Sequence, residues 1–236
     1  MTRHVALVPA AGVGARFGAA TPKQYVRLAG KTVLQHSAEV LLACDQIDAV
    51  AIVVSAADGH IDSVYPSSGL PEKLHILRCG GDSRAETVRN GTQALLAQGL
   101  LAADDWLLVH DAARCCLPAT ALQRLLDTVA AHPVGGLLAM PLADTLKRAN
   151  GQHSVAATLN RSHLWQAQTP QMFRAGLLQQ ALADADLNQI TDESSAVEAL
   201  GLQPLLVEGD SRNFKLTRAQ DAILAECLLR QSQESA

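Results

Sequence analysis

The sequence predicts an α/β fold in which a mostly parallel β-sheet carries helices on both faces. Three observations lead to this prediction. Short apolar runs alternate with segments whose apolar residues recur at helical spacing along most of the 236 residues. The short runs are apolar throughout, as expected of strands that are buried on both sides. One segment, approximately residues 142–165, breaks the alternation and has the pattern of a projecting β-arm.

Five short runs have the composition of buried strands. Their apolar residues are continuous, and a helical pattern follows most of them, which is typical of parallel strands joined by crossover helices. The predicted strands are residues 4–9, 49–55, 74–79, 106–110 and 135–141.

The helices are predicted from apolar spacing and from their end signals. Residues 33–44 carry apolar side chains at helical intervals. Residues 83–99 begin with a capping box, Ser83 with Glu86, and Gly99 is a plausible residue after the C-terminus. Residues 118–132 begin with a proline near the first turn, and the last helix is expected at roughly 218–230.

The arm segment differs from the rest of the chain. Within residues 143–168, an Asn150-Gly151 turn is flanked by residues compatible with strands, which predicts a β-hairpin. A hairpin cannot bury itself alone, so we expect the arm to pack on a second copy of the chain as a homodimer. No long polar linker interrupts the sequence, so residues 1–236 are predicted to form a single domain.

Composition argues against several classes of function. The formal net charge is −4 and the isoelectric point is about 6.0, which disfavours non-specific nucleic-acid binding. Aromatic residues make up 3% of the chain, which leaves few stacking platforms for single-stranded nucleic acid. No apolar run reaches the ~18 residues of a membrane span. The apolar run after Arg3 is too short for a signal peptide.

The cysteines favour a cytoplasmic protein with reduced thiols. Five are present, two of them adjacent, with no CxxC pair and no zinc-ligand spacing. We interpret all of them as packing residues. They are Cys44, Cys79, Cys115, Cys116 and Cys227.

The first strand ends in a loop rich in glycine and positive charge. Gly12, Gly14 and Gly18 leave room for a ligand to approach the main chain, and Arg16 and Lys23 could pair with phosphate oxygens. Because open α/β sheets bind ligands beyond the carboxyl ends of their strands, this loop is a candidate phosphate site. The alternative is a tight turn with two solvated cations.

Two familiar phosphate loops do not fit this segment. The dinucleotide fingerprint GxGxxG requires glycine where Phe17 stands. The P-loop requires glycine five residues before Gly30, where Tyr25 stands. The loop is therefore expected to hold phosphate in another way.

Asp111 directly follows the strand predicted at 106–110, on the same sheet edge as the glycine loop. A carboxylate there could hold Mg²⁺ against nucleotide phosphates, and Arg114 could face the same ligand. The alternative is that Asp111 caps the following turn. His110, at the end of a buried strand, is interpreted as a hydrogen-bonded core residue rather than a general base.

Six blocks of the sequence resemble the 2-C-methyl-D-erythritol 4-phosphate cytidylyltransferases of the non-mevalonate isoprenoid pathway. Wider sugar-nucleotide pyrophosphorylases share similar glycine loops, but the six blocks in order cover nearly the full length. They are "PAAGVGARFG…PKQY" (9–25), "VHDAAR" (109–114), "DTLKR" (144–148), "NRSHLWQAQTPQMF" (160–173), "ITDESSAVE" (190–198) and "VEGDSRNFKLTRAQD" (207–221).

The resemblance implies a Rossmann-like nucleotidyltransferase fold, a homodimer joined through the arm, and transfer of CMP from CTP to methylerythritol phosphate with release of pyrophosphate. It implies Arg16 and Lys23 as catalytic residues and Asp111 as the Mg²⁺ ligand. Implied nucleotide-binding residues are Pro9, Ala10, Ala11, Gly12, Gly14, Gly81, Asp82, Thr87 and Ala112. Implied substrate-positioning residues are Arg114, Thr145, Arg161, Thr169, Thr191 and Lys215, with Arg161 on the arm and able to serve the partner's site.

The chain departs from the family pattern at two positions. Cys115 stands where a proline often follows the HDAAR block, and Arg212 stands where an acidic or small residue is expected. The first loosens the loop after Asp111 without removing a ligand, and the second affects the loop that carries Lys215.

Three other functions compete with this interpretation. A cytidylyltransferase for another polyol phosphate, such as ribitol 5-phosphate, would share the glycine and HDAAR blocks. A regulatory nucleotide-binding module is disfavoured because Arg16, Lys23 and Asp111 are retained. A nicotinamide oxidoreductase is disfavoured by Phe17 and by the lack of an acidic residue at a strand end ~20 residues further on.

Overall fold

The computed structural model describes residues 2–12, 21–184, 186–187 and 189–234. Its centre is a seven-stranded sheet in the order β11-β7-β10-β6-β1-β4-β5. Strand β10 runs antiparallel to β6 and β7, whereas the other neighbouring pairs are parallel, which confirms the predicted mostly parallel sheet. The strands are β1 (His4–Pro9), β4 (Ala49–Val53), β5 (Leu74–Leu77), β6 (Trp106–Val109), β7 (Gly135–Pro141), β10 (Trp165–Arg174) and β11 (Leu205–Glu208).

The first strand shows why its sequence is apolar at every position. Ala6 and Val8 point into the core on one face of the sheet, and Val5 and Leu7 point into the core on the other. All four side chains are fully buried. Because β1 lies between β4 and β6, neither of its edges meets solvent.

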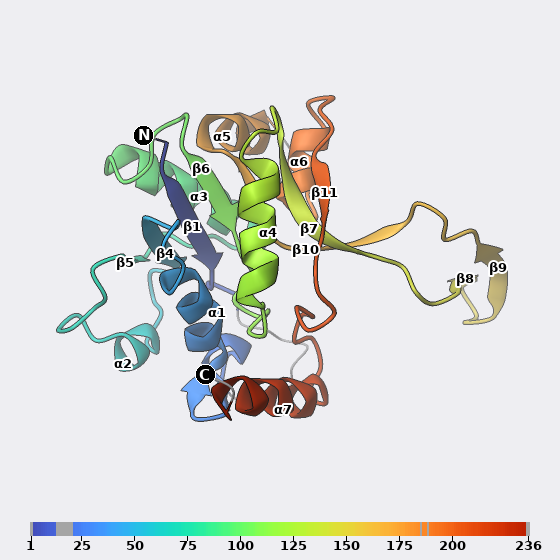
Figure 1. The fold of residues 1–236 in the computed structure, drawn as a ribbon, viewed down its shortest axis with the longest axis horizontal. Coiled ribbons are helices and arrows are strands. Elements are labelled where there is room, and N and C mark those ends of the chain that lie inside the picture. Colours follow the sequence, from blue (N-terminus) through green and yellow to red (C-terminus); the bar gives the residue numbers. More distant parts are fainter. Residues whose placement is uncertain (1, 13–20, 185, 188, 235–236) are drawn as a thin grey trace.

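Helices cover both faces of the sheet, as predicted (Figure 1). Helices α1 (Val33–Leu42) and α4 (Ala119–Val129) contribute Leu34, Leu41, Leu122 and Leu125 to the core on one face. The core on the opposite face of the sheet is covered by α3 (Arg84–Ala97), α5 (Ala175–Asp184) and α6 (Glu193–Glu198).

The predicted capping box of α3 forms in half. Ser83 Oγ accepts a 3.1 Å hydrogen bond from the amide of Glu86, as predicted. The Glu86 carboxylate accepts instead from the amide of Asp82, one residue before the cap, at 2.9 Å. Gly99 adopts a φ of 69° directly after the C-cap, in the left-handed region that favours glycine.

The C-terminal helix α7 (Asp221–Glu234) begins later and ends later than predicted. The Asp221 carboxylate accepts from the amides of Thr217 and Arg218 at 2.8 Å each, which holds those residues in a turn before the helix. Leu229 of α7 packs with Leu28 and Cys115 in a third, smaller core. The remaining short elements are η2 (Lys23–Tyr25), β2 (Arg27–Leu28), β3 (Lys31–Thr32) and α2 (Ile61–Val64).

The arm is a two-stranded hairpin that projects from the end of β7 and returns into β10 (Figure 1). Strands β8 (Leu146–Ala149) and β9 (Val155–Leu159) pair antiparallel. The connection is longer than the predicted two-residue turn, because Asn150 Oδ1 accepts from the amides of Gln152 and Ser154 and so stabilises a wider loop.

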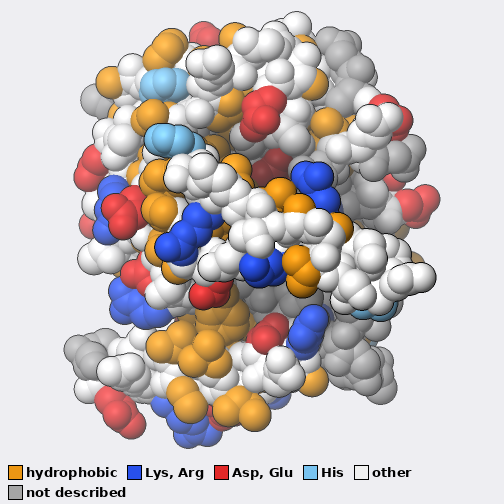
Figure 2. All heavy atoms as spheres, turned by 90° about the vertical axis from the view of Figure 1, so that its right-hand side faces the viewer, with side chains coloured by type: hydrophobic (Ala, Val, Ile, Leu, Met, Phe, Trp, Pro, Cys, Tyr) orange, Lys and Arg blue, Asp and Glu red, His pale blue; other side chains and the backbone are white. Residues whose placement is uncertain are grey.

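Seen from the arm's side, basic side chains lie on and around the arm with hydrophobic groups between them (Figure 2). Large apolar side chains at the arm and its base are exposed: Val155 at 65%, Leu164 at 40% and Trp165 at 36%. Among the helices of the described residues, none combines the length and the apolar character that crossing a membrane requires.

Candidate active site

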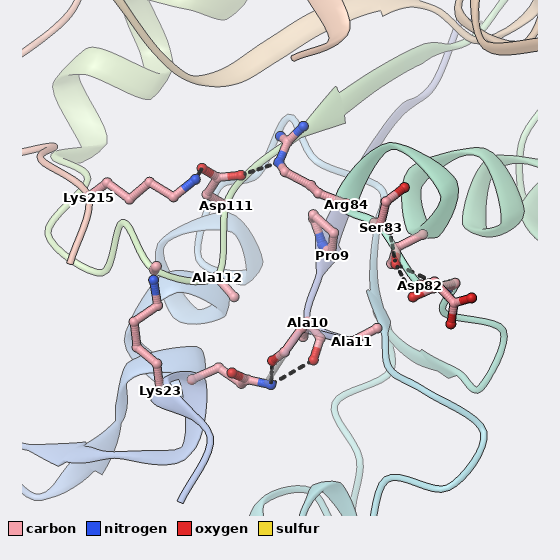
Figure 3. Close-up of a pocket in the computed structure, with 15 residues that line it drawn as sticks. Pro9, Ala10, Ala11, Lys23, Asp82, Ser83, Arg84, Asp111, Ala112 and Lys215 are labelled. Carbon is pink, nitrogen blue, oxygen red and sulfur yellow. Dashed lines mark hydrogen bonds and ion pairs between the residues drawn. The ribbon is translucent and has the colours of Figure 1, made fainter. Parts of the chain in front are cut away.

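A pocket opens where β1 and β6 end, at the same edge of the sheet (Figure 3). The main chain of residues 9–12 forms one wall, and residues 81–84 at the start of α3 form another. The loop after β6, residues 111–113, contributes the third wall. Lys23, Gln24, Thr87 and Lys215 complete the lining.

Asp111 carries the charge at the centre of this pocket. Arg84 and Lys215 approach its carboxylate from opposite sides (Figure 3). Arg84 Nε lies 2.7 Å from Oδ1, and Lys215 Nζ lies 2.7 Å from Oδ2. Arg114 Nε lies 3.9 Å from Oδ2. One carboxylate thus faces three cationic side chains.

These cations keep Asp111 ionised. Burial alone would raise the pKa of Asp111, but the positive charges of Arg84 and then Lys215 outweigh burial and hold that pKa well below its usual range. The charge of Asp111 in turn raises the pKa of Arg84, where burial is opposed first by Glu193 and then by Asp111. Asp111 and Arg84 are therefore both charged at neutral pH.

The main chain of Asp111 is held by a buried polar chain. Its amide donates to Thr169 Oγ1 at 2.9 Å, and this hydroxyl lies 3.1 Å from His110 Nδ1. His110 Nε2 lies 3.2 Å from the carbonyl oxygen of Arg114. Burial lowers the pKa of His110 to about 4, so the ring is neutral at pH 7. As expected of a core histidine, the ring links the end of β6 to Thr169 of β10.

The described part of the glycine loop is supported from two sides. Gln24 Nε2 donates to the carbonyl oxygens of Ala10 and Gly12 at 2.8 and 2.9 Å. Gly80 lies against the loop so closely that a Cβ there would stand 2.4 Å from the Cβ of Ala11 and 2.9 Å from the main chain of Val54. Any side chain at position 80 would displace the loop.

A second pocket shares Asp111, Arg84 and Lys215 with the first. Its other walls come from β10 and from the segment before α6. The Asp111 cluster thus separates two adjacent pockets, one walled by main chain of the glycine loop and one by polar side chains. The second pocket is also lined by Arg114, Ala167, Gln168, Thr169, Gln171, Thr191 and Asp192.

Comparison with known proteins identifies the family. Residues 4–231 match the family model described as 2-C-methyl-D-erythritol 4-phosphate cytidylyltransferase. The Neisseria meningitidis protein of that name is 53% identical over 227 residues, which cover 96% of this chain and 97% of the relative. The chain belongs to the 2-C-methyl-D-erythritol 4-phosphate cytidylyltransferase family.

Solved structures of the family share the fold. A crystal structure of a 4-diphosphocytidyl-2C-methyl-D-erythritol synthase superimposes with a TM-score of 0.86 at 48% identity, covering 97% of this chain and 99% of that one. The 2-C-methyl-D-erythritol 4-phosphate cytidylyltransferase from Thermus thermophilus superimposes with a TM-score of 0.76 at 30% identity, covering 98% and 100% of the two chains. These likenesses confirm the predicted nucleotidyltransferase fold.

Most residues predicted from the family resemblance lie in the two pockets. Lys23 and Asp111 line the first, together with the predicted nucleotide-binding residues Pro9, Ala10, Ala11, Gly12, Gly81, Asp82, Thr87 and Ala112. The second is lined by the predicted positioning residues Arg114, Thr169, Thr191 and Lys215. Gly14 and Arg16 lie outside the described residues.

Two predicted positioning residues lie on the arm, outside both pockets of their own chain. Thr145 directly precedes β8. Arg161 lies between β9 and β10, where it lines a shallow surface pocket with Leu164 and Trp165. Neither residue lines the candidate site of its own chain.

Sequence reasoning missed four residues that shape the site: Gln24, Gly80, Arg84 and Glu193. Arg84 was visible as a basic residue after the Ser83 cap, but nothing in the sequence links it to Asp111. Glu193 lies within a quoted family block, yet its contact with Arg84 joins residues 109 positions apart. Both contacts depend on tertiary structure.

The donor set at Asp111 fits one kind of metal site. The described residues contain no group of three or more His, Cys, Asp or Glu side chains arranged to hold a metal ion. Mg²⁺ in nucleotide enzymes commonly takes one or two carboxylates and completes its shell with water and substrate phosphates. A single buried carboxylate lining an open pocket, as Asp111 does, suits that arrangement.

Proposed function

We propose that the protein transfers the cytidylyl group of CTP to 2-C-methyl-D-erythritol 4-phosphate, giving 4-diphosphocytidyl-2-C-methyl-D-erythritol and pyrophosphate. Family membership supports this activity. The observation that carries it is the pair of pockets joined at Asp111. The glycine-loop pocket suits the nucleotide, and the pocket lined by Arg114, Thr169 and Lys215 suits the phosphate of the second substrate.

The chain's own residues would act by position and charge. A phosphate monoester is mostly ionised at neutral pH, so its oxygen can attack the α-phosphorus without a protein nucleophile. That oxygen forms the new bond while the bond from the α-phosphorus to the pyrophosphate oxygen breaks. The obstacle is repulsion between two anions. Lys23 and Lys215, with Arg16 as predicted from the sequence, would offset that repulsion and stabilise the departing pyrophosphate.

Asp111 is the residue that would hold Mg²⁺, through Oδ2. When bound, the ion supplies positive charge to the phosphate oxygens of the nucleotide. Arg84 would stay on Oδ1, because its other nitrogens are engaged by Glu193. Lys215 would turn from Asp111 toward the second substrate's phosphate, which would occupy the pocket that Lys215 also lines.

We also propose that residues 1–236 form one nucleotidyltransferase domain that dimerises through the arm, approximately residues 142–165. The exposed side chains of Val155, Leu164 and Trp165 support an interface there. In such a homodimer, Thr145 and Arg161 of each arm would serve the partner's site. The cytoplasmic location stays a prediction from the sequence.

Pyrophosphate release tests this function directly. The purified protein is mixed with CTP, Mg²⁺ and 2-C-methyl-D-erythritol 4-phosphate, and ribitol 5-phosphate replaces the alcohol phosphate in a parallel reaction. We expect release with the first acceptor and much slower release with the second. Equal or faster release with ribitol 5-phosphate would assign the other polyol substrate, and no release with either would contradict the proposed function.

A further inference from the structure

Glu193 is a buried carboxylate behind the candidate active site. Its side chain is 1% exposed, and it is not among the described residues that line either pocket. Both of its oxygens are bound by Arg84, Oε1 by one terminal nitrogen at 2.6 Å and Oε2 by the other at 2.9 Å. This two-point geometry is the strongest arrangement that arginine and a carboxylate form.

Arg84 uses its third nitrogen on Asp111. Nε donates to Oδ1 at 2.7 Å, so one planar guanidinium bridges two buried carboxylates that belong to different parts of the chain. A planar group with three fixed contacts cannot rotate without breaking at least one of them. Glu193 therefore determines where Arg84 lies, and Arg84 determines the orientation of the Asp111 carboxylate.

The position of Glu193 is itself fixed to the sheet. The next residue, Ser194, donates its amide to Gln171 Oε1 at 2.7 Å, and Gln171 Nε2 donates to Asp192 at 2.9 Å. Gln171 belongs to β10 and is 1% exposed. The start of α6 is thus held against a central strand on both sides of Glu193.

Of the three cations that face Asp111, Arg114 is the most distant at 3.9 Å, and the two close ones differ in how easily they can leave it. Arg84 has a side chain that is 26% exposed, and its departure would leave Glu193 buried without a countercharge, which is strongly unfavourable. Lys215 has a side chain that is 43% exposed and makes one ion pair at Oδ2. The exchangeable partner of Asp111 is therefore Lys215.

We propose that Glu193 is a positioning residue for the divalent cation: through Arg84 it holds Asp111 Oδ1, so that the cation replaces Lys215 at Oδ2. This inference rests on the proposed function and extends it to a residue that touches neither substrate. Residues that orient a metal ligand without touching the metal commonly contribute 10- to 100-fold to metal affinity.

Mn²⁺ binding to the Glu193→Gln variant tests the inference. The probe is Mn²⁺ with CTP, without the alcohol phosphate, and free Mn²⁺ is measured by electron paramagnetic resonance against a blank of CTP alone. We expect Mn²⁺ affinity to fall about 10- to 100-fold relative to the unaltered protein. Affinity unchanged in a folded variant would overturn the inference, whatever happens to thermal stability.

The matched control is Asp62→Asn. Asp62 accepts from one terminal nitrogen of Arg78 at 2.7 Å on both oxygens, but it lies on α2 and outside both pockets. The control removes an exposed arginine–carboxylate pair away from the candidate site, so Mn²⁺ affinity should stay within about twofold of the unaltered protein. A fall equal to that of Glu193→Gln would show that the effect is general and would overturn the inference.

A structure of the unaltered protein with CTP and Mn²⁺ gives a test that needs no variant and so does not depend on Glu193→Gln folding. We expect Arg84 to bridge Glu193 and Asp111 Oδ1, with Lys215 displaced from Oδ2 by the cation. Arg84 displaced instead of Lys215 would overturn the inference. Pyrophosphate release by the unaltered protein, measured in parallel, shows whether the proposed function stands independently of this result.

Discussion

Lys23 Nζ donates a 2.7 Å hydrogen bond to the main-chain carbonyl oxygen of Leu216, the residue that follows Lys215. This contact joins the segment after the glycine loop to the C-terminal part of the chain. It brings two lysines from positions far apart in the sequence to one side of the pocket that contains Asp111 (Figure 3). The wall of the candidate nucleotide site is therefore built from both ends of the chain.

Replacing Lys23 with alanine should abolish most turnover without unfolding the protein. One positive charge aimed at developing phosphate charge is worth roughly 100- to 1,000-fold in kcat, whereas one hydrogen bond contributes about 1 kcal/mol to stability. Pyrophosphate release and thermal unfolding measure the two effects. Lys31→Ala is the matched control, because Lys31 pairs with Glu39 at the surface and lies outside both pockets. Normal kcat in Lys23→Ala would reject the assigned role.

Asp111→Asn keeps the side-chain shape and removes the charge that Arg84 and Lys215 neutralise. We expect pyrophosphate release to fall at least about 100-fold and its dependence on Mg²⁺ concentration to shift to higher values. A Mg²⁺ titration of the variant and of the unaltered protein measures both. Asp127→Asn, on the exposed side of α4, serves as the control. The metal assignment would be wrong if the Mg²⁺ dependence did not move.

Arg161→Ala should raise the KM for the alcohol phosphate and leave the KM for CTP nearly unchanged. Mixed dimers test whether Arg161 acts across the interface. When Arg161→Ala and Lys23→Ala chains are unfolded together and refolded, half of the dimers contain one chain of each kind. One of their two sites would then be complete, so at an alcohol phosphate concentration far below the KM of Arg161→Ala about a quarter of the unaltered activity should return. If Arg161 serves its own chain, mixing adds no activity to that of the two variants assayed separately.

Asp105 should make the fold sensitive to acid. Its buried carboxylate accepts from the amides of Arg3 and Ala102 at 2.9 Å each and from Arg3 Nε at 3.3 Å, which ties the start of β1 to the start of β6. Burial alone would raise the pKa of Asp105, but these amides and the Arg3 guanidinium lower it below its usual value.

The lowered pKa of Asp105 determines the direction in which the free energy of unfolding changes with pH. Below about pH 4 the unfolded chain binds a proton at Asp105 before the folded protein does, so stability is lost as the pH falls through the folded pKa. Asp105→Asn should lower the free energy of unfolding by about 2 kcal/mol at pH 7. The difference in this free energy between the variant and the unaltered protein should narrow toward pH 3. Urea unfolding at both pH values measures it. An equal difference in the free energy of unfolding at both pH values would contradict a lowered pKa of Asp105 in the folded protein.

The sequence predicted the parts of the fold that depend on local pattern. The strands at 4–9 and 135–141 have the predicted limits, and three others begin at the predicted residue. Strand β10 was not predicted, because its first three residues are exposed and the next six are buried, so its residues show no single periodicity. The register and the antiparallel insertion of β10 between β6 and β7 depend on contacts distant in sequence.

Contacts between residues distant in sequence also limited the prediction of the candidate site. Asp111 and Lys23 could be predicted because each directly follows a recognisable strand or loop. Glu193 could not, since its role depends on Arg84, which projects from another helix. The close approach of Gly80 to Ala11 was likewise invisible, because it joins the ends of two parallel strands.

Strand β10 has a consequence for the proposed dimer. Trp165 lies at the base of the arm and Thr169 lies beside Asp111, four residues along the same strand, a span of at most about 14 Å. One strand, with a register shift between Ala167 and Gln171, connects the two positions, so a tilt of the arm would act on the main chain beside the pocket. A molecule bound at the base of the arm would therefore act on both candidate sites of the proposed dimer without entering either one.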